Sequence, residues 1–540
     1  MITRILSIII LCLLMNSAYS QVSEITSSNL PLLVINTNKV EINDVEKIQA
    51  TMKLISNGIG KVNKPTDPGN NYDGYIGIEV RGASSSTNPQ RPFSIETRDI
   101  SGKNQDVSLL GMPKENDWIL LANYNDKTFM RNVLAYSLFE KMGHYAPRTR
   151  MVEVILNNSY QGVYILTEKI KRDKGRVNIA KLTSTDVSGD AITGGYIFKI
   201  DYYNELDSWI SNYAPFNHPE KAVTYVYADP SYDELVLEQK DYLKETVNSF
   251  EKMLASRDFA DKTNGYASWI DVKSFIDYFI VNEVSRNVDG FKKSFFFYKD
   301  KSSNGGKINA GPVWDFDWAW KNIYDCTIFQ ATDGSGWSHK INDCPDPWPN
   351  SNDWMVKLLQ DPDFANALNK RYFELRNSYL SSSYLNSFID SVQNMVGEAQ
   401  VRHYQKWNIL SVSVGAPEVG SQSATYAGQV SQFRWWIQTR LTWLDANMLG
   451  ESTNANTDQF QVADGLRIFP NPASDPVNIE GSSEIQEIQV FNSNGKSVFR
   501  QSRIFKFSTR LDVSGLTSGI YLVCLKVKGN KLITNKLVVR

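Results

Sequence analysis

One acidic motif, residues 311–320 with the sequence Gly-Pro-Val-Trp-Asp-Phe-Asp-Trp-Ala-Trp, limits what this chain can build more than any other segment. It places Asp315 and Asp317 two residues apart between aromatic side chains. Side chains at positions i and i+2 of an extended segment point to one side, so both carboxylates could bind one cation. Hard divalent cations such as Mg²⁺ and Ca²⁺ take oxygen ligands. An acidic turn whose carboxylates cap nearby backbone groups is the structural alternative.

The chain ahead of this motif begins with strand patterns. Residues 32–37, 75–81 and 93–98 read as short strands, and the last two are joined by a loop of small residues from Gly82 to Ser86. Because small residues allow backbone N–H groups to approach an anion closely, this loop suits a phosphate group. An ordinary polar hairpin loop is the alternative.

Helical patterns then become more frequent. A helix is predicted from Asp126 to about Met142, where apolar residues recur every four positions. A hairpin at residues 151–156 and 162–168 follows, then a strand at 194–201, and from about residue 231 the pattern is helical. One helix ends near Ser285 and leads through a loop into a strand at 295–298 and the acidic motif, after which residues 351–450 are helical. The prediction is an α+β chain, strand-rich first and helical later.

This order of parts suits phosphoryl transfer. That reaction needs positioned phosphates, a metal ion held by an acidic residue, and a base near the acceptor hydroxyl. Asp289 and Asp315 lie on loops that bracket a short hairpin. The two aspartates therefore match the catalytic loop and the metal-binding loop that such an enzyme requires.

Several ordered motifs resemble the spore coat protein H (CotH) kinases, an atypical secreted kinase family, over roughly residues 30–450. The motifs are Arg-Gly-Ala-Ser-Ser at 81–85, Leu-Leu-Gly-Met-Pro-Lys-Glu-Asn-Asp-Trp at 109–118, Met-Arg-Asn at 130–132, Gly-Val-Tyr-Ile-Leu-Thr-Glu-Lys-Ile at 162–170, Gly-Gly-Tyr at 194–196 and Pro-Val-Trp-Asp-Phe-Asp at 312–317. The resemblance implies a reduced two-lobed, protein-kinase-like fold with a β-rich N-lobe and a helical C-lobe. It also implies the use of ATP with Mg²⁺ or Mn²⁺.

Carried over by motif, the resemblance gives Asp289 the catalytic role and makes Asp315 the metal-binding aspartate, with Asp317 as a second ligand. Kinases place an asparagine for the metal five residues after the catalytic aspartate, and here that position is Ser294. A hydroxyl can still bind the metal, although more weakly.

The nucleotide-binding residues that the resemblance implies come from two segments. Arg81, Gly82, Ser84 and Ser85 would lie over the phosphates, and Glu168 and Lys169 would lie at the adenine side, where the lobes connect. Many relatives carry a phosphate-pairing lysine after the small-residue loop. Here Arg91 keeps the charge, but arginine and lysine are not interchangeable.

The C-terminal region has a different character. Residues 451–464 are polar and typical of a linker, and four alternating strands, 488–491, 505–512, 519–526 and 532–539, predict a small β-sandwich at 465–540. Phe-Pro-Asn-Pro-Ala-Ser at 469–474, Gly-Ile-Tyr-Leu-Val at 519–523 and the basic end resemble the sorting domain of the type IX secretion system. The resemblance implies contact with that secretion machinery; a generic adhesive or carbohydrate-binding sandwich is the alternative.

Features of the N-terminus and the cysteines indicate export. Residues 1–20 read as a signal peptide with cleavage before Gln21, which leaves residues 21–450 as the kinase-like domain. No later stretch reaches the roughly 20 apolar residues of a transmembrane helix. Cys326 and Cys344 flank a polar loop and are predicted to form a disulfide. We therefore expect a secreted or surface protein that is exported through the periplasm.

Three functions fit these observations. The first is a secreted kinase that transfers the γ-phosphate of ATP to Ser or Thr of an extracellular or surface protein, which the Asp289 and Asp315 pair favours. The second is a catalytically weak or inactive kinase-like binding or adhesion protein, which the scarcity of ATP outside cells favours. Glycan binding by exposed tryptophans such as Trp337 and Trp348 is a third. A formal net charge of −2 gives no argument for nucleic acid as a partner.

Overall fold

The fold is described from a computed structural model. It covers residues 25–540 except 324–325, 421, 452–465, 470, 474–475, 493–495 and 529–530. The predicted signal peptide and nearly all of the predicted linker lie outside these described residues. The chain divides into two compact units, residues 1–453 and 454–540, and mixes helices with sheets.

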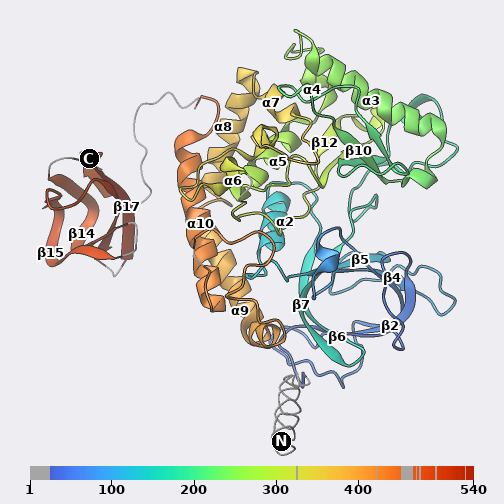
Figure 1. The fold of residues 1–540 in the computed structure, drawn as a ribbon, viewed down its shortest axis with the longest axis horizontal. Helices are drawn as coiled ribbons and strands as arrows, with labels where there is room; N and C mark the ends of the chain where they lie inside the picture. The colour runs from blue at the N-terminus through green and yellow to red at the C-terminus, as the bar shows by residue number, and fades with distance from the viewer. Residues whose placement is uncertain are drawn as a thin grey trace, which may run out of the picture. The chain divides into compact units, whose positions relative to one another are not determined.

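The first part of the larger unit is a closed barrel whose strands follow the order β1-β2-β3-β4-β5-β7-β6 (Figure 1). The alternation of buried and partly exposed residues along the strands accounts for this barrel. In β4 every second residue is buried, and Ile95 pairs with Ile78 of β3 and with Trp118 of β5. The strands are β1 Leu32–Asn36, β2 Ile48–Ile55, β3 Tyr72–Val80, β4 Phe93–Arg98, β5 Asp117–Ala122, β6 Thr149–Leu156 and β7 Ser159–Glu168. The predicted strand-rich first part is thus present.

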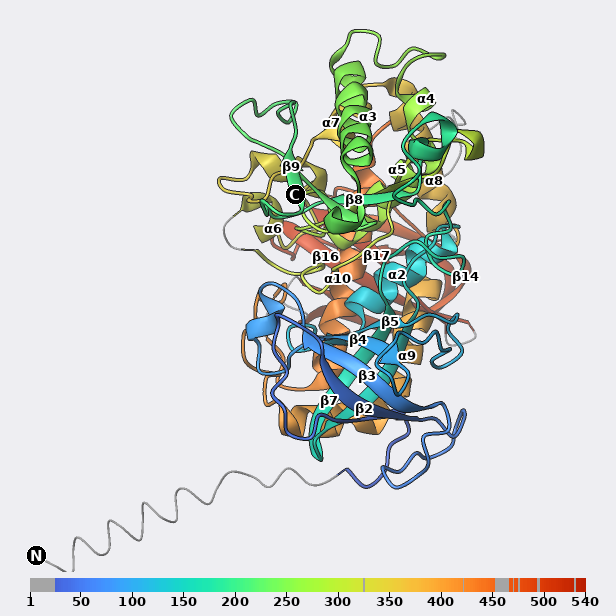
Figure 2. The ribbon, with the colours of Figure 1, turned by 90° about the vertical axis from the view of Figure 1, so that its right-hand side faces the viewer.

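A second, five-stranded antiparallel sheet has the order β12-β11-β8-β10-β9. Its strands β8 and β11 confirm the strands predicted at 194–201 and 295–298, whereas β9, β10 and β12 are not predicted from the sequence. Figure 2 shows β8 and β9 beside α3, on the other side of α2 from the barrel strands. Aromatic residues hold this sheet together, because the rings of Phe198 and Phe297 stack with centroids 5.2 Å apart. Its strands are β8 Tyr196–Ile200, β9 Ser208–Ile210, β10 Thr224–Asp229, β11 Phe295–Lys299 and β12 Ile308–Ala310. The second part of the unit is therefore helical around a sheet.

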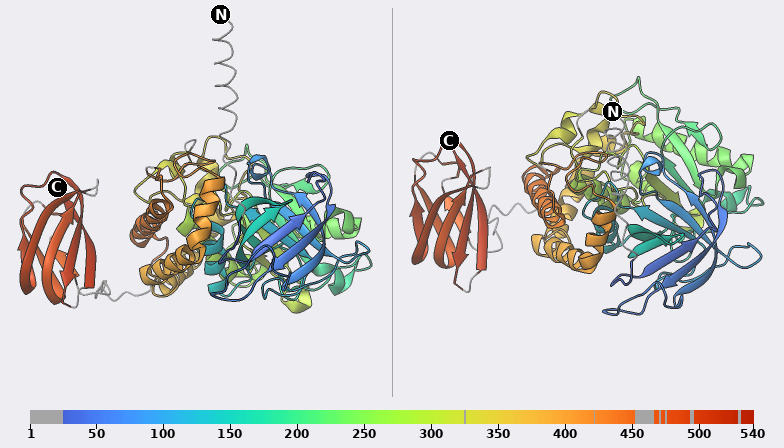
Figure 3. Two further views of the ribbon diagram at one scale, coloured as in Figure 1. Left: turned by 90° about the horizontal axis from the view of Figure 1, so that it is seen from below. Right: turned by 60° about the horizontal axis from the view of Figure 1, so that its bottom comes forward.

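The helices surround a central one, α5, which is buried along almost its whole length. Its first turn is capped by Asp271, whose side chain accepts a hydrogen bond from the backbone N–H of Ser274. Figure 3 shows α9 and α10 lying beside the barrel and the other helices. The α-helices are α2 Arg131–Lys141, α3 Leu237–Ala255, α4 Tyr266–Trp269, α5 Val272–Ser285, α6 Thr327–Gln330, α7 Trp354–Leu358, α8 Pro362–Arg376, α9 Ser382–Lys406 and α10 Tyr426–Asn447.

Helix α2 begins at Arg131, five residues later than the sequence predicts. The reason is that Asp126 lies in a turn before the helix. Its carboxylate accepts hydrogen bonds from the backbone N–H groups of Thr128, at 3.0 Å, and Arg131, at 2.8 Å. Aspartate side chains often compete with helical hydrogen bonding in this way.

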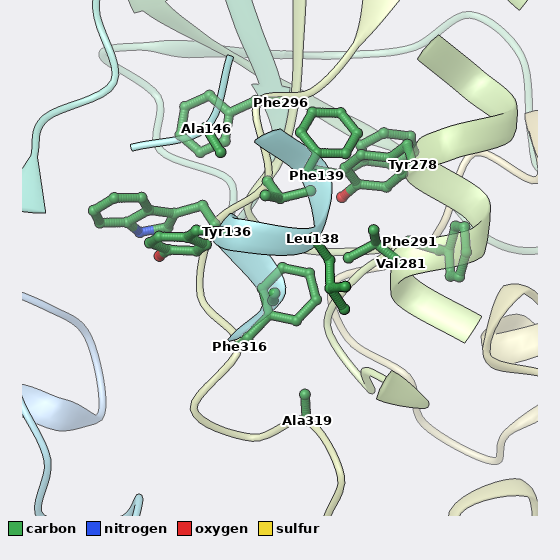
Figure 4. Close-up of a cluster of buried hydrophobic side chains, with 14 of the residues drawn as sticks. Tyr136, Leu138, Phe139, Ala146, Tyr278, Val281, Phe291, Phe296, Phe316 and Ala319 are labelled. Atoms are coloured by element: carbon green, nitrogen blue, oxygen red, sulfur yellow. The ribbon is translucent and has the colours of Figure 1, made fainter. Parts of the chain in front are cut away.

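Helix α2 connects the acidic motif to α5 through a cluster of buried side chains (Figure 4). The ring of Tyr136 stacks on Trp314 with centroids 5.8 Å apart and meets Phe316 edge-on. One turn further, Phe139 meets Tyr278 of α5 edge-on at 6.4 Å. The main-chain position of the acidic motif is therefore set by the hydrophobic core.

The C-terminal unit is one connected five-stranded sheet, in which β14 pairs with β13, β15 and β16, and β16 with β17. Ile488, Val523 and Leu525 are among its fully buried side chains. The strands are β13 Leu466–Phe469, β14 Val477–Phe491, β15 Ser497–Leu511, β16 Gly519–Val527 and β17 Lys531–Val539. The predicted strands are present, and the arrangement as a sandwich stays a prediction.

No helix in the described part of the chain is long and apolar enough to cross a membrane.

A disulfide joins Cys326 and Cys344, with the two Cα atoms 5.3 Å apart. It closes the segment that follows the acidic motif. That segment also touches α5, since the backbone N–H of Ser338 donates to the carboxylate of Glu283 at 3.0 Å.

Replacing both cysteines by serine should lower the free energy of unfolding by about 3 kcal/mol, because the open loop gives the unfolded chain more conformational entropy. Urea unfolding of the oxidised wild type and the double variant measures the difference. Thiol labelling provides the control: without reductant, neither Cys326 nor Cys344 should react, and modification of both would contradict the disulfide.

Candidate active site

A cavity of about 580 Å³ lies where one end of the barrel faces the second sheet and the acidic motif. Most of the site residues predicted from the sequence line this cavity. The predicted site residues that line it are Arg81, Gly82, Ser84, Ser85, Lys169, Asp289, Ser294, Asp315 and Asp317.

Asp315 lines this cavity and has an unusual backbone conformation. Its φ is +64°, and that of Ser294, whose hydroxyl donates to Asp315 Oδ2 at 3.3 Å, is +49°. Such conformations are costly for residues other than glycine and persist only where the surroundings enforce them. Here helix α2 does so, because Asn132 Oδ1 accepts a 2.7 Å hydrogen bond from the backbone N–H of Phe316.

Asp317 lies close to Asp315 and is held by Asn125, whose side-chain amide donates to Asp317 Oδ2 at 2.6 Å. Burial, together with the charge of Asp315, raises the pKa of Asp317 to about 7. Burial also raises the pKa of Asp315, although Lys293 and Arg81 act in the opposite direction. Each of these two neighbouring carboxyl groups has a raised pKa. A divalent cation bound beside them would stabilise both as carboxylates.

The two carboxyl groups could therefore hold a magnesium or manganese ion, which takes oxygen ligands. Among the described residues, no group of three or more His, Cys, Asp or Glu side chains surrounds a common point. A magnesium ion in a nucleotide site is commonly held by one or two carboxylates, and phosphate and water oxygens complete its shell.

Asp289 stands on the loop between α5 and β11, near two lysines. The Nζ atoms of Lys292 and Lys293 lie 3.5 and 3.9 Å from its carboxylate oxygens. Burial alone would lower the pKa of Lys293, but the charges of Asp289 and Asp315 outweigh it and raise that pKa. Lys293 is therefore a stable cation between the two aspartates.

The small-residue loop follows β3 and covers the cavity. Gly82 has a φ of +94°, and a Cβ atom there would lie 2.2 Å from the Ser85 hydroxyl, so only glycine fits. Arg81 directly precedes it, with its guanidinium 5.4 Å from the ring centroid of Trp314. Its charge is close enough to influence Asp315.

Two predicted nucleotide residues do not line the cavity. Arg91 is exposed because its neighbour Gln90 points inward, donating to Val163 O at 3.0 Å and accepting from Asn123 N at 3.1 Å. Glu168 is fully buried elsewhere, where its carboxylate accepts hydrogen bonds from the Arg148 guanidinium and backbone N–H.

Part of the cavity wall was not predicted from the sequence. It comes from the end of β8 and the loop to β9, with Lys199, Asp201, Tyr202 and Asp207, and from β10, with Val226 to Ala228. The one available signal was the Gly-Gly-Tyr motif at 194–196, which marks β8 but not the loop after it. Lys293 was also missed, although it directly precedes Ser294.

Comparison with known families gives two matches. Residues 467–540 match the secretion system C-terminal sorting domain, which indicates export to the cell surface or the medium and contact with the type IX machinery. The other match, to the CotH kinase protein family, covers residues 78–444. That family implies the use of a nucleotide and a divalent metal in general. No curated protein matches the chain.

Nine solved chains match this protein. One is PorZ, an essential bacterial surface component of the type IX secretion system of Porphyromonas gingivalis, at 18% identity and a TM-score of 0.13. Another is CopC from Methylosinus trichosporium OB3b, at 16% identity and a TM-score of 0.12. Each match covers 14% of this chain, and the chain spans 11% of PorZ and 90% of CopC.

The longer family match contains the small-residue loop, Asp289, Ser294 and the acidic motif that together line the cavity. Since it spans residues 78–444 of 540, well over half of the sequence, the chain belongs to the CotH kinase protein family.

Proposed function

We propose that the protein is a secreted atypical protein kinase that transfers the γ-phosphate of ATP to Ser or Thr of an extracellular or surface protein. The observation that carries this proposal is the meeting of Asp289, Asp315, Asp317 and the Gly82 loop in one cavity. In this view the barrel is the N-lobe, and the second sheet with its helices is the C-lobe.

The roles follow from charge and position. Asp315 and Asp317 hold Mg²⁺ or Mn²⁺, which when bound neutralises charge on the phosphates. Asp289 accepts the proton of the acceptor hydroxyl, and its two neighbouring lysines hold its carboxylate in position for that task. The loop of Gly82, Ser84 and Ser85 offers its backbone N–H groups to phosphate oxygens. Ser294 orients Asp315 through its hydrogen bond.

Arg81 takes the phosphate-pairing role in this proposal, in place of a lysine near position 91. It lines the cavity at the start of the phosphate loop, whereas Arg91 is exposed outside it. Lys293 is a second cation that can turn from Asp289 and Asp315 toward a phosphate.

A kinase-like protein that binds without catalysing transfer is the second candidate. The observation that favours it is the position of Ser294, where a neutral hydroxyl stands instead of an amide ligand and already donates to Asp315. A weakened metal site of this kind would still leave a folded scaffold.

Replacing Asp315 and Asp289 separately by alanine distinguishes their roles. Asp315→Ala removes the main carboxylate of the metal, so both the binding of Mg²⁺-ATP and phosphate transfer should fall. Asp289→Ala removes no proposed metal ligand, so nucleotide binding should be retained while transfer falls by about 10²- to 10⁴-fold.

The measurement is transfer of label from ATP with Mg²⁺ or Mn²⁺, together with calorimetric titration of nucleotide. If the wild type binds nucleotide but labels nothing, including itself, the binding protein is the better description. If all three proteins label equally, the active site lies elsewhere.

The two arginines form a matched pair. Arg81→Ala should weaken nucleotide binding by about tenfold, because it removes one charge-assisted contact with phosphate. Arg91→Ala makes the same chemical change outside the cavity and should leave affinity unchanged. Titration with ATP and Mg²⁺ measures both affinities. If Arg91→Ala weakens binding as much as Arg81→Ala does, the assignment of phosphate binding to Arg81 is wrong.

Export should remove both ends of the chain. The signal peptide pattern and the sorting domain lead us to expect a mature protein that begins at Gln21 and lacks residues 465–540. Intact-mass analysis of protein collected from the medium or the cell surface measures this. A secreted protein that keeps its last strand would argue against removal of the sorting domain.

A further inference from the structure

A second cavity, of about 240 Å³, lies between β9 and α3 and shares no lining residue with the first. One wall comes from β9 and the residues after it, and the other from one face of α3. The lining residues are Trp209, Ile210, Ser211, Asn212, Lys244, Val247, Asn248 and Glu251.

Glu251 is the unusual member of this set, because it is a carboxyl group that is only 6% exposed. Its hydrogen-bond donors are all neutral: the hydroxyls of Ser211, at 2.6 Å, and Tyr225, at 2.7 Å, and the indole N–H of Trp354, at 3.2 Å. In the described part of the chain, no lysine, arginine or histidine nitrogen lies within 4 Å of it. A buried carboxylate without a cation is costly.

The two carboxylate oxygens have different surroundings. Oε1 accepts from both Tyr225 and Trp354, neither of which lines the cavity. Oε2 accepts only from Ser211, which does line it. An ionised carboxylate oxygen can accept two hydrogen bonds, so Oε2 keeps a free acceptor position on the cavity side. Because no cation offsets its burial, the pKa of Glu251 is raised to about 7. A cation that entered the cavity would stabilise the charged carboxylate.

Two further features define what the cavity suits. The buried indole of Trp209 forms part of the wall, and aromatic faces attract cations. Lys244 is exposed and precedes Glu251 by seven residues on α3, which places the two about 10 Å apart along the helix axis. The positive charge is therefore two turns away from the negative one.

From this geometry we propose that the cavity binds a small organic molecule through a primary ammonium group, which donates to Glu251 Oε2 beside Trp209. An anionic group at the far end of the same molecule would reach toward Lys244. The ligand class is thus a small alkylamine or, better, an ω-amino acid. This proposal does not depend on phosphate transfer.

Titration of the full chain with three probes of similar length tests it. n-Butylamine should bind saturably and raise the thermal midpoint, whereas n-butanol, which lacks the charge, should do neither. 5-Aminopentanoate should bind more tightly than n-butylamine, and this advantage should disappear in Lys244→Gln. Equal behaviour of n-butylamine and n-butanol, or the absence of any saturable binding, would overturn the proposal.

The variant Glu251→Gln should bind n-butylamine at least about tenfold more weakly, because it removes the charged partner. Glu238→Gln is the matched control, since Glu238 is an exposed acid on α3 outside the cavity. If Glu251→Gln does not fold, the variant Asn248→Leu tests the proposal instead. This substitution narrows the cavity without changing the hydrogen-bond partners of Glu251, so it should abolish binding of n-butylamine. Unchanged binding in Glu251→Gln or in Asn248→Leu would contradict the assignment.

Discussion

The geometry of the candidate site depends on a buried cluster of charges at the C-terminal end of α5. Glu283 is fully buried and accepts hydrogen bonds from the Arg440 guanidinium at 2.9 Å and from His339 Nδ1 at 2.8 Å. Burial alone would raise its pKa, but His339 and Arg440 outweigh this and lower the pKa. Three residues later, Arg286 donates to the carbonyls of Ala331 and Ser335. The disulfide-closed segment, α10 and the loop of Asp289 are thereby joined at one point. Removing one partner of such a buried pair typically costs about 3–5 kcal/mol.

A second buried network supports the other half of the site. Arg131 at the start of α2 bonds to Asp126 at 2.6 Å and to Glu418, and Lys321 lies 3.6 Å from Glu418. Lys321 also donates to the carbonyl of Asn125, the residue that holds Asp317. The loop of Asp289 and the turn of Asp315 and Asp317 therefore contact separate buried ion networks, each of which joins segments far apart in the sequence. Arg131 lies in the Met-Arg-Asn motif, but the other members of the two networks are single charged residues whose partners only folding identifies.

How far the sequence predicts this structure depends on whether a signal is local. Alternation predicts β4 with its observed bounds, since each of its residues reports which face it occupies. Asp315 and Asp317 do lie close together, but alternation does not explain it, because Asp315 has a φ of +64° and is not in an extended segment. In the second sheet, β8 and β11 match predicted strands, whereas β9 and β12 are not predicted, because three residues are too few to show an alternating pattern. The wall from Lys199 to Asp207 lies in the cavity only because β8 pairs with β11.

The charges that line the main cavity bear on the proposed binding of metal and nucleotide there. The lining carries five aspartates, Asp201, Asp207, Asp289, Asp315 and Asp317, and four bases, Arg81, Lys169, Lys199 and Lys293. With all of these groups ionised the wall is slightly negative, so a triphosphate alone would be repelled. If Asp315 and Asp317 hold a divalent cation, as proposed, that cation would make the wall positive and would weaken the attraction of Arg81 and Lys293 to their present neighbours. These two cations would then be available to phosphates, so under the proposed function metal and nucleotide should bind with positive coupling.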